Sequence, residues 1–235
     1  CFENPSRCKK ENMKKTIVYL LVITVSIIAL ATSILYEQKH ERKLPILNPT
    51  DVYPALVDSS LHNKGINHTI LDFHLINQNG DSVTQEIIKD RVVVANFFFA
   101  TCPTICPIMN SQLSRVHDKY VNNDDVIILS HTVWPEIDTF EALKEYGKLF
   151  FADPKRWQFL TGDKHHLYNL ARKSYLVAPS VNDTNFDQGG EGDFIHTENI
   201  VLIDKKRRIR GFYDGTDSLE VSQLIEDVQI LLEHK

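Results

Sequence analysis

The stretch VVVANFFFATCPTICPIM, residues 92–109, contains the features that decide the fold. Residues 92–99 are apolar on both faces of an extended chain, which is typical of a central strand covered by helices on both sides. Cys102 and Cys106 follow, each directly before a proline. Beyond them, apolar residues recur at helical spacing and predict an amphipathic helix: Met109, Leu113, Val116 and Tyr120. The succession predicts an α/β unit with two thiols at a strand-to-helix junction.

The rest of the chain adds elements on both sides of this unit. The segment TILDFHLINQNGDSVT, residues 69–84, predicts a hairpin that turns at Asn79-Gly80. After the central helix we expect, in chain order, a strand at 126–130, a helix at 140–150, a strand at 157–161, a helix at 165–175, a hairpin of residues 199–204 and 208–213, and a closing helix over 221–232. This order predicts a thioredoxin-like α/β fold, with a central mixed sheet flanked by helices.

An N-terminal apolar segment, residues 16–36, carries no charged side chain. At 1.5 Å per residue it is about 31 Å long, enough to cross the hydrocarbon core of a bilayer. The lysines before it predict a cytoplasmic N-terminus and an outward-facing domain: Lys9, Lys10, Lys14 and Lys15. The small residues Ala29 and Ala31 also fit a cleavable signal peptide. Apolar residues continue to Tyr36, which favours an uncleaved transmembrane anchor.

These features divide the chain into four parts. Residues 1–15 are expected to be a cytoplasmic tail or an upstream artefact, because Met13 begins a run that is typical of a bacterial N-terminus. Residues 16–36 are expected to form the transmembrane helix, residues 37–66 a linker with three prolines, and residues 67–235 the folded thioredoxin-like domain. No long Arg/Ser-rich transit sequence precedes the span. We therefore expect a single-pass protein of the bacterial inner (cytoplasmic) membrane, with its C-terminal domain facing the periplasm.

Charge and cysteine usage exclude two classes of protein. The net charge of −5 and the pI near 6.1 leave no basic field of the kind that nucleic-acid-binding proteins carry. The basic run KKRR, residues 205–208, is interpreted as a hairpin turn. Two of the four cysteines, Cys1 and Cys8, lie before Met13, so the cysteines are not spread through the fold as in a disulfide-stapled scaffold. We expect no nucleic acid among the partners.

The two loop cysteines are expected to be reactive. Cys102 precedes a proline and is biased toward extended backbone angles. Cys106 also precedes a proline and suits the N-cap of the following helix, where the helix dipole stabilises a thiolate and lowers its pKa. We therefore expect both sulfurs to be ionisable, close together and near the surface, rather than two inert buried thiols.

Two chemical interpretations of this pair stay open, a redox dithiol and a metal site. A thioredoxin-type dithiol has two residues between its cysteines and a cis-proline just before the next strand of the hairpin. Here three residues separate Cys102 from Cys106, and the last proline, Pro179, lies about twenty positions before that strand. His196 stands there instead, so its imidazole is expected to approach the cysteine loop. Two thiolates and an imidazole suit copper, either Cu(I) or Cu(II), whereas a closed structural zinc site would need a fourth protein ligand.

The other histidines are weaker candidates for the metal site. His131 is the rival to His196, because it ends a central strand near the cysteines. His117, His165 and His166 fall on predicted helices and are expected to face solvent.

The segment between Ala178 and His196 is rich in glycine and acidic residues. It has little apolar surface to bury and much backbone freedom to lose. We expect capture of a metal by His196 to order this segment, which would couple copper binding to the surface that a partner meets.

With these residues in place, the chain resembles the Sco/SenC family of membrane-anchored copper proteins over about residues 69–232. The resemblance rests on the segments DFHLINQNGDSVT, VVVANFFFATCPTICPIM, PEIDTFEALKEYGKLF, WQFLTG and IHTENIVLID. It implies a thioredoxin-like fold and one copper bound through Cys102, Cys106 and His196. It also implies a copper chaperone that helps assemble the dinuclear copper centre of cytochrome c oxidase. The implied partners are the copper-bearing subunit of the oxidase and a copper donor protein.

The alternative is an enzyme, a thiol-disulfide oxidoreductase that keeps the cysteines of the oxidase subunit reduced with Cys102 and Cys106 as its redox dithiol. The two roles can coexist, because copper loading requires reduced thiols on donor and acceptor. A peroxidase is a weaker third alternative, since no arginine partner for a peroxidatic cysteine is evident. Trp134 and Ile195 stand where the family often has Asp, which removes acidic groups near the site.

Overall fold

The computed structural model describes residues 5–54, 57–61, 67–178, 195 and 197–233. The chain forms two compact units, Cys1–Lys43 and Leu44–Lys235. The first unit contains helix α1, Pro5–Glu41, within which Met13–Tyr36 is long and apolar enough to cross a membrane. The side chains of this 24-residue segment are exposed, as those of a lipid-facing helix would be. Among the described residues no other helix has this length and hydropathy. The predicted span, residues 16–36, lies within it.

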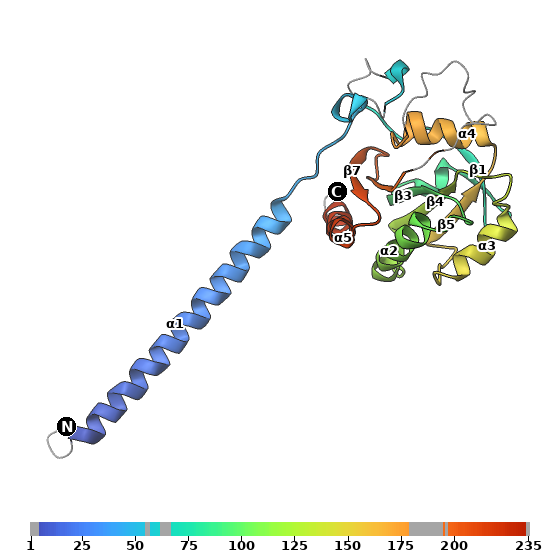
Figure 1. Ribbon diagram of the computed structural model, residues 1–235. Helices are drawn as coiled ribbons and strands as arrows, with labels where there is room; N and C mark the ends of the chain where they lie inside the picture. Colours follow the sequence, from blue (N-terminus) through green and yellow to red (C-terminus); the bar gives the residue numbers. More distant parts are fainter. Residues whose placement is uncertain (1–4, 55–56, 62–66, 179–194, 196, 234–235) are drawn as a thin grey trace. The chain divides into compact units, whose positions relative to one another are not determined.

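The second unit is built on a seven-stranded sheet with the strand order β2-β1-β5-β4-β3-β6-β7 (Figure 1). The strands are β1 His74–Asn77, β2 Ser82–Thr84, β3 Val92–Phe98, β4 Val126–Thr132, β5 Trp157–Thr161, β6 Asn199–Ile203 and β7 Ile209–Asp214. β3, β4 and β5 are parallel, and the pairs β1–β2, β1–β5, β3–β6 and β6–β7 are antiparallel. All residues of β3 are buried, as its apolar sequence predicted. The expected mixed sheet is confirmed.

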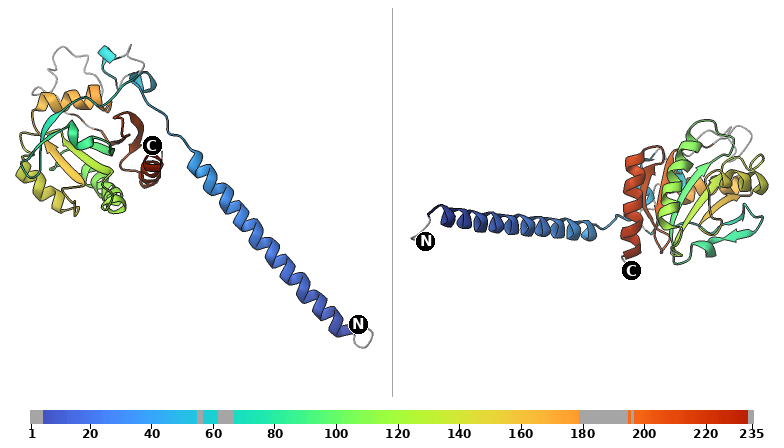
Figure 2. Two further views of the ribbon diagram at one scale, coloured as in Figure 1. Left: turned by 180° about the vertical axis from the view of Figure 1, so that it is seen from behind. Right: turned by 90° about the horizontal axis from the view of Figure 1, so that it is seen from below.

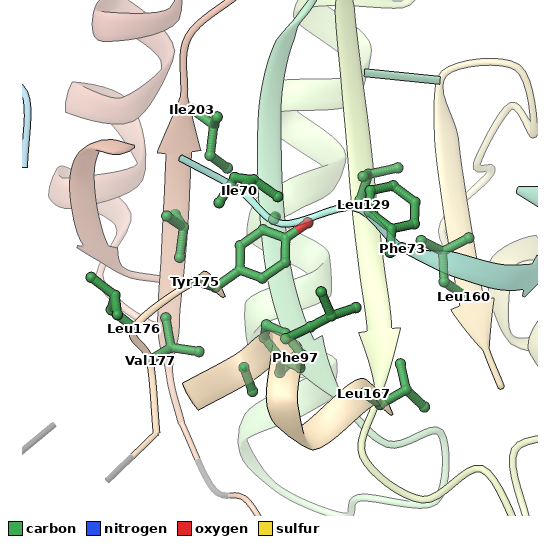
Figure 3. Packing of buried hydrophobic residues seen from close by; sticks show 14 of the residues in the cluster. Ile70, Phe73, Phe97, Leu129, Leu160, Leu167, Tyr175, Leu176, Val177 and Ile203 are labelled. Atoms are coloured by element: carbon green, nitrogen blue, oxygen red, sulfur yellow. The ribbon is translucent and has the colours of Figure 1, made fainter. Parts of the chain in front are cut away.

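Helices cover both faces of the sheet (Figures 1 and 2). One face, called here the α2 face, packs against α2 Ile105–Tyr120, α3 Phe140–Lys148 and α5 Ser218–Glu233. The opposite face, the α4 face, packs against α4 Lys164–Asn169 and the π-helix η5 Leu170–Ser174 that continues it. The residues of β3 alternate between the two cores: Val92, Val94 and Phe98 on the α2 face, and Val93, Ala95 and Phe97 on the α4 face. Figure 3 shows the α4-face core around Tyr175.

The two predicted hairpins are present. β1 and β2 pair with His74 opposite Thr84, and the turn contains Gly80 at φ +82°, an angle that glycine adopts without strain. β6 and β7 are joined by the basic run, in which Arg207 has φ +64°. The interpretation of that run as a hairpin turn is therefore confirmed. Short 3₁₀ helices occur at η1 Pro49–Asp51, η3 Ser59–Leu61 and η4 Gln85–Ile88.

The compact unit begins before residue 67, where the sequence placed the start of the folded domain. Leu44 is buried, and the N–H of Leu47 donates to the carbonyl of Ile209 in β7 at 2.9 Å. The guanidinium of Arg210 also donates to the carbonyl of Leu44 at 2.5 Å. The segment expected to be a linker therefore belongs to the compact unit from Leu44 onward. Its prolines did not indicate this, because the contacts come from an edge strand and an arginine more than 160 residues away.

Candidate metal centre

The cysteine loop joins the end of β3 to the start of α2. The N–H of Cys102 donates to the carbonyl of Phe99, 3.2 Å away, and closes a turn. The N–H of Cys106 donates to Sγ of Cys102 at 3.5 Å, so this sulfur lies at the N-terminal end of α2. The hydroxyl of Thr104 is 3.9 Å from the same sulfur. Both thiols are free, and they interact with each other. The expected proximity of the two sulfurs is confirmed.

Two expectations about the pair are wrong. The cysteines do not lie near the surface, because Cys102 is 7% exposed and Cys106 3% exposed, both within the α2-face core. Cys106 is not the N-cap of α2, since Thr104 is the N-cap and Ile105 the first helical residue. A proline is tolerated anywhere in the first turn of a helix, so Pro107 did not fix the start of α2 to the residue before it.

The two thiols differ in pKa. Burial raises the pKa of Cys106 to about 12, and the neighbouring sulfur of Cys102 adds to this effect. Burial also acts against the thiolate of Cys102, but hydrogen bonds from the backbone N–H groups of Cys106 and Thr104 outweigh it and lower the pKa of Cys102. The lowered pKa that was predicted for Cys106 is therefore wrong, and the thiol whose pKa is lowered is that of Cys102. The amides at the start of the helix point to the first sulfur, and the core surrounds the second.

Buried polar side chains hold the start of α2 in place. Nδ2 of Asn96 in β3 donates to Oδ1 of Asn110 at 3.2 Å, and Nδ2 of Asn110 donates to the hydroxyl of Tyr146 at 2.9 Å. Burial raises the pKa of Tyr146, and the nearby Cys106 contributes to this shift. The sequence contains a signal for this network. Asn96 interrupts an otherwise apolar strand, and Asn110 lies one helical turn after Cys106.

His131, the expected rival ligand, belongs to the α4 face. Its ring stacks on Phe97 at a centroid distance of 4.8 Å and lies 5.0 Å from the ring of Tyr175. Figure 3 shows these two aromatic residues in the α4-face core. Nδ1 of His131 lies 3.3 Å from the carbonyl of Asn96, and Nε2 lies 3.4 Å from the hydroxyl of Tyr175. Burial lowers the pKa of His131 to about 4. Its side chain is a neutral core group on the face opposite the cysteines.

The expectation for the helical histidines holds only in part. His117 is buried, and its Nε2 accepts from the N–H of Asp153 at 3.1 Å, because α2 turns this side chain toward β5. The prediction that His117 faces solvent is therefore wrong. His165 is exposed and His166 is half-buried, and the N–H of His74 donates to Nε2 of His166 at 3.3 Å.

His196 and residues 179–194 lie outside the described residues. Thr197, directly after the histidine, is buried, and its hydroxyl accepts from the N–H of Asn199 at 3.1 Å. β6 runs antiparallel to β3 with Val201 opposite Ala95, so the chain enters β6 at the end of β3 from which the cysteine loop leaves. Across the part of the chain that the structure describes, no group of three or more His, Cys, Asp and Glu side chains could hold a metal ion.

Comparisons with known proteins identify relatives of this chain. The SCO1/SenC family model matches residues 62–233. The SCO1 protein homolog of Bacillus subtilis (strain 168) is 29% identical over 166 residues, which cover 70% of this chain and 83% of the relative. An SCO2-like protein of Rickettsia prowazekii (strain Madrid E) is 32% identical over 157 residues, covering 66% of this chain and 74% of the relative.

Solved structures give the same result. The SCO1/SenC family lipoprotein of Bacillus anthracis has a TM-score of 0.61 at 26% identity, over 73% of this chain and 99% of that one. BsSco, a member of the Sco family of cytochrome c oxidase assembly proteins with a disulfide switch, has a TM-score of 0.59 at 28% identity, over 72% and 96%. Copper-bound ScoI of Bradyrhizobium japonicum has a TM-score of 0.54 at 25% identity, over 70% and 99%. With its thioredoxin-like sheet, its cysteine loop and a family match over most of its length, the chain belongs to the SCO1/SenC family.

Proposed function

We propose that the protein is a membrane-anchored copper chaperone that binds one copper through Cys102, Cys106 and His196. The observation that carries the proposal is the pair of free thiols at the junction of β3 and α2, where the N–H of Cys106 donates to the sulfur of Cys102. Soft sulfur donors suit Cu(I), and an added imidazole nitrogen suits Cu(II). Both sulfurs come from one short loop anchored in the core, so little chain needs to be ordered when the metal arrives.

The third ligand rests on the sheet register. Because β6 enters the sheet beside the end of β3, we expect the chain just before β6 to approach the end of β3 where the cysteine loop begins. This supports His196 as the nitrogen donor. His131 does not compete for that role, since its ring lies in the core of the other face.

Family membership supports the proposed cargo and acceptor. Relatives include a copper-bound Sco protein and a member of the Sco family of cytochrome c oxidase assembly proteins. We infer that this chain delivers copper for the dinuclear copper centre of cytochrome c oxidase. Its partners would then be the copper-bearing subunit of the oxidase and a protein that donates copper.

The location follows from the apolar helix. Met13–Tyr36 fits a membrane anchor, and the lysines before it favour a cytoplasmic N-terminus. The domain from Leu44 onward would then face the periplasm. A C-terminal reporter enzyme that folds only outside the cytoplasm should be active in cells, and a reporter active only inside the cytoplasm would contradict this orientation.

Copper titration of the full chain in detergent tests the proposed function. The expected result is one copper per chain and, for Cu(II), a visible thiolate-to-copper absorption band. A control variant with Cys1→Ser and Cys8→Ser should behave like the wild type, because neither residue belongs to the proposed site. Failure of the reduced protein to bind copper at micromolar concentration would overturn the proposal.

A second function, thiol-disulfide exchange with the oxidase subunit, is favoured by the opposite pKa shifts of the two thiols. Cys102 has a lowered pKa, and Cys106 has a raised pKa and is buried behind it. This suits attack by the first thiol on a target disulfide and resolution by the second, so that the target is reduced to two thiols and this pair is oxidised to a disulfide. Copper-free protein that reduces a target disulfide, with the activity surviving His196→Ala, would favour exchange. Activity that requires copper or the histidine would count against it.

A further inference from the structure

Asp138 is a fully buried carboxylate in the turn that follows β4. Its Oδ2 accepts a hydrogen bond from the hydroxyl of Thr132 at 2.5 Å and another from the backbone N–H of Ala100 at 3.1 Å. The hydroxyl oxygen of Thr132 in turn accepts from the N–H of Trp134 at 2.9 Å. A single carboxylate oxygen therefore joins the end of β4 to the residue two positions before Cys102.

The bond to Ala100 acts on the turn that carries the first cysteine. Ala100 lies inside the turn closed by the hydrogen bond from Cys102 to the carbonyl of Phe99. The strand before it is already fixed, because the N–H of Val133 donates to the carbonyl of Phe98 at 2.8 Å. The hydrogen bond from the Ala100 amide to Asp138 thus ties the start of the cysteine loop to the paired ends of β3 and β4.

A buried carboxylate in this position is costly for folding. Oδ1 of Asp138 has no hydrogen-bond partner among the described residues. Burial raises the pKa of Asp138, against the two hydrogen bonds that favour its charged form. An apolar residue or an asparagine would fill a buried turn at lower cost, so stability alone does not account for a carboxylate here.

We propose that Asp138 is a positioning residue of the metal centre, which holds the Ala100 amide against the end of β4 and so fixes the turn from which Cys102 presents its sulfur to Cys106. The Cys106 side of the loop is held independently, through Asn110 and Tyr146. Loss of the carboxylate should therefore loosen one sulfur relative to the other without melting α2. The metal readout below rests on the proposed copper function, whereas the dithiol readout does not.

The test compares four variants of the full chain in detergent, each carrying Cys1→Ser and Cys8→Ser. Asp138→Ala removes the acceptor, and Asp138→Asn keeps an acceptor oxygen without the charge. Thr132→Val removes one donor while leaving Ala100 bonded. Asp227→Ala is the matched control, because Asp227 is also buried and also accepts from a hydroxyl, that of Tyr213 at 2.7 Å, far along the sequence from the cysteine loop.

The first readout is the metal-free dithiol–disulfide equilibrium in glutathione buffers, in which the two thiols and one oxidised glutathione give the intramolecular disulfide and two reduced glutathiones. We expect Asp138→Ala to lower the equilibrium constant for disulfide formation about tenfold, because a looser loop lowers the effective concentration of one thiol at the other. The equilibrium constant of Asp138→Asn should stay within about threefold of the wild-type value, and that of Thr132→Val should lie between the values of Asp138→Asn and Asp138→Ala. Asp227→Ala should leave the constant unchanged.

The second readout is Cu(II) binding followed by the thiolate-to-copper absorption band. We expect Asp138→Ala to shift the band and weaken binding about 10- to 100-fold, as loss of a partner outside the direct ligands does in other metal sites. Wild-type protein that binds no copper, with Asp138→Ala still shifting the dithiol equilibrium, would overturn the copper function and uphold the positioning role. Intact copper binding, with neither readout moved by Asp138→Ala and Thr132→Val, would overturn the positioning role alone. An equal shift in Asp227→Ala would also overturn it, because the effect would then be one of general stability.

Discussion

At the ends of β3 and β4, the two faces of the sheet differ in how the surrounding groups contact their buried titratable side chains. On the α2 face, Cys102 and Cys106 contact each other, and backbone amides at the start of α2 point to the first sulfur. On the α4 face, His131 lies between two aromatic rings, and both of its nitrogens are within reach of protein partners. The cysteines keep donor atoms that a ligand could use. Both ring nitrogens of the histidine already face protein partners inside the core.

This contrast shows what distinguishes a site from a core polar group. Both sets are buried, and both have shifted pKa values. The difference is that the two sulfurs lie together at the start of α2, whereas the two ring nitrogens of His131 face a backbone carbonyl and a hydroxyl. Burial and a shifted pKa therefore do not identify a ligand without the direction of its donor atoms.

The largest expected effect separates the two faces by metal affinity. Replacing Cys102 or Cys106 by serine should weaken copper binding by more than about a hundredfold, beyond the roughly 10- to 100-fold effect of partners outside the direct ligands. His131→Phe should change the affinity by less than about twofold, because its ring has no part in the site. Copper titration monitored by visible absorption measures both. Equal losses of copper affinity in the cysteine variants and in His131→Phe would contradict this difference between the two faces.

The second effect concerns the pH dependence of stability. The pKa of His131 is lowered to about 4 in the folded protein, so between pH 6.5 and 4 the unfolded chain binds a proton that the folded one does not. Stability should therefore fall as the pH drops through this window, by about 3 kcal/mol for this residue. Denaturant unfolding of the wild type and His131→Phe at pH 7 and pH 4.5 measures it. The difference in unfolding free energy between the two proteins should narrow or reverse at low pH. A difference that stays constant with pH would show that His131 is not held neutral.

The third effect separates the two thiols within the α2 face. Because the pKa of Cys102 is lowered and that of Cys106 is raised to about 12, iodoacetamide should modify Cys102 at least about tenfold faster at pH 8. Peptide mapping by mass spectrometry after short reaction times resolves the two sites, and the rate of each can be compared with that of an unfolded control in denaturant. Faster modification of Cys106 would reverse the assigned roles.

The smallest effect concerns the polar network below the loop. Tyr146→Phe removes the acceptor of Asn110 and should cost about 1–2 kcal/mol of unfolding free energy. Denaturant unfolding measures the loss, and the pH dependence that belongs to His131 should be unchanged because the two groups occupy different faces. If Tyr146→Phe altered that pH dependence instead, the two cores would be coupled.

The sequence predicted the sheet well because its signals are local. The apolar run of β3, the turn at Gly80 and the spacing of apolar residues in α2 each report on their own few residues. The same reasoning found both cysteines. The burial of these cysteines and the pKa of Cys106 were predicted wrongly, because both depend on packing by α3 and α5 from distant parts of the chain.

The roles of the supporting side chains could not be predicted for the same reason. Asp138 contacts Ala100 across 38 positions, and Arg210 contacts Leu44 across 166, distances that no spacing rule covers. His131 lies one residue before the end of β4, close to where it was expected, yet only the alternation of side chains in β4 decides which face it takes. A one-residue difference in register would have turned it toward the cysteines.

The most direct test of the central claim is a Cu(II) titration of the wild type, His196→Ala and His131→Phe as full chains in detergent. The wild type and His131→Phe should each bind one copper with the same thiolate-to-copper absorption band. His196→Ala should lose or strongly shift that band while keeping the wild-type free energy of unfolding. A wild-type spectrum and stoichiometry in His196→Ala, or loss of the band in His131→Phe, would contradict the assignment of Cys102, Cys106 and His196 as the copper ligands.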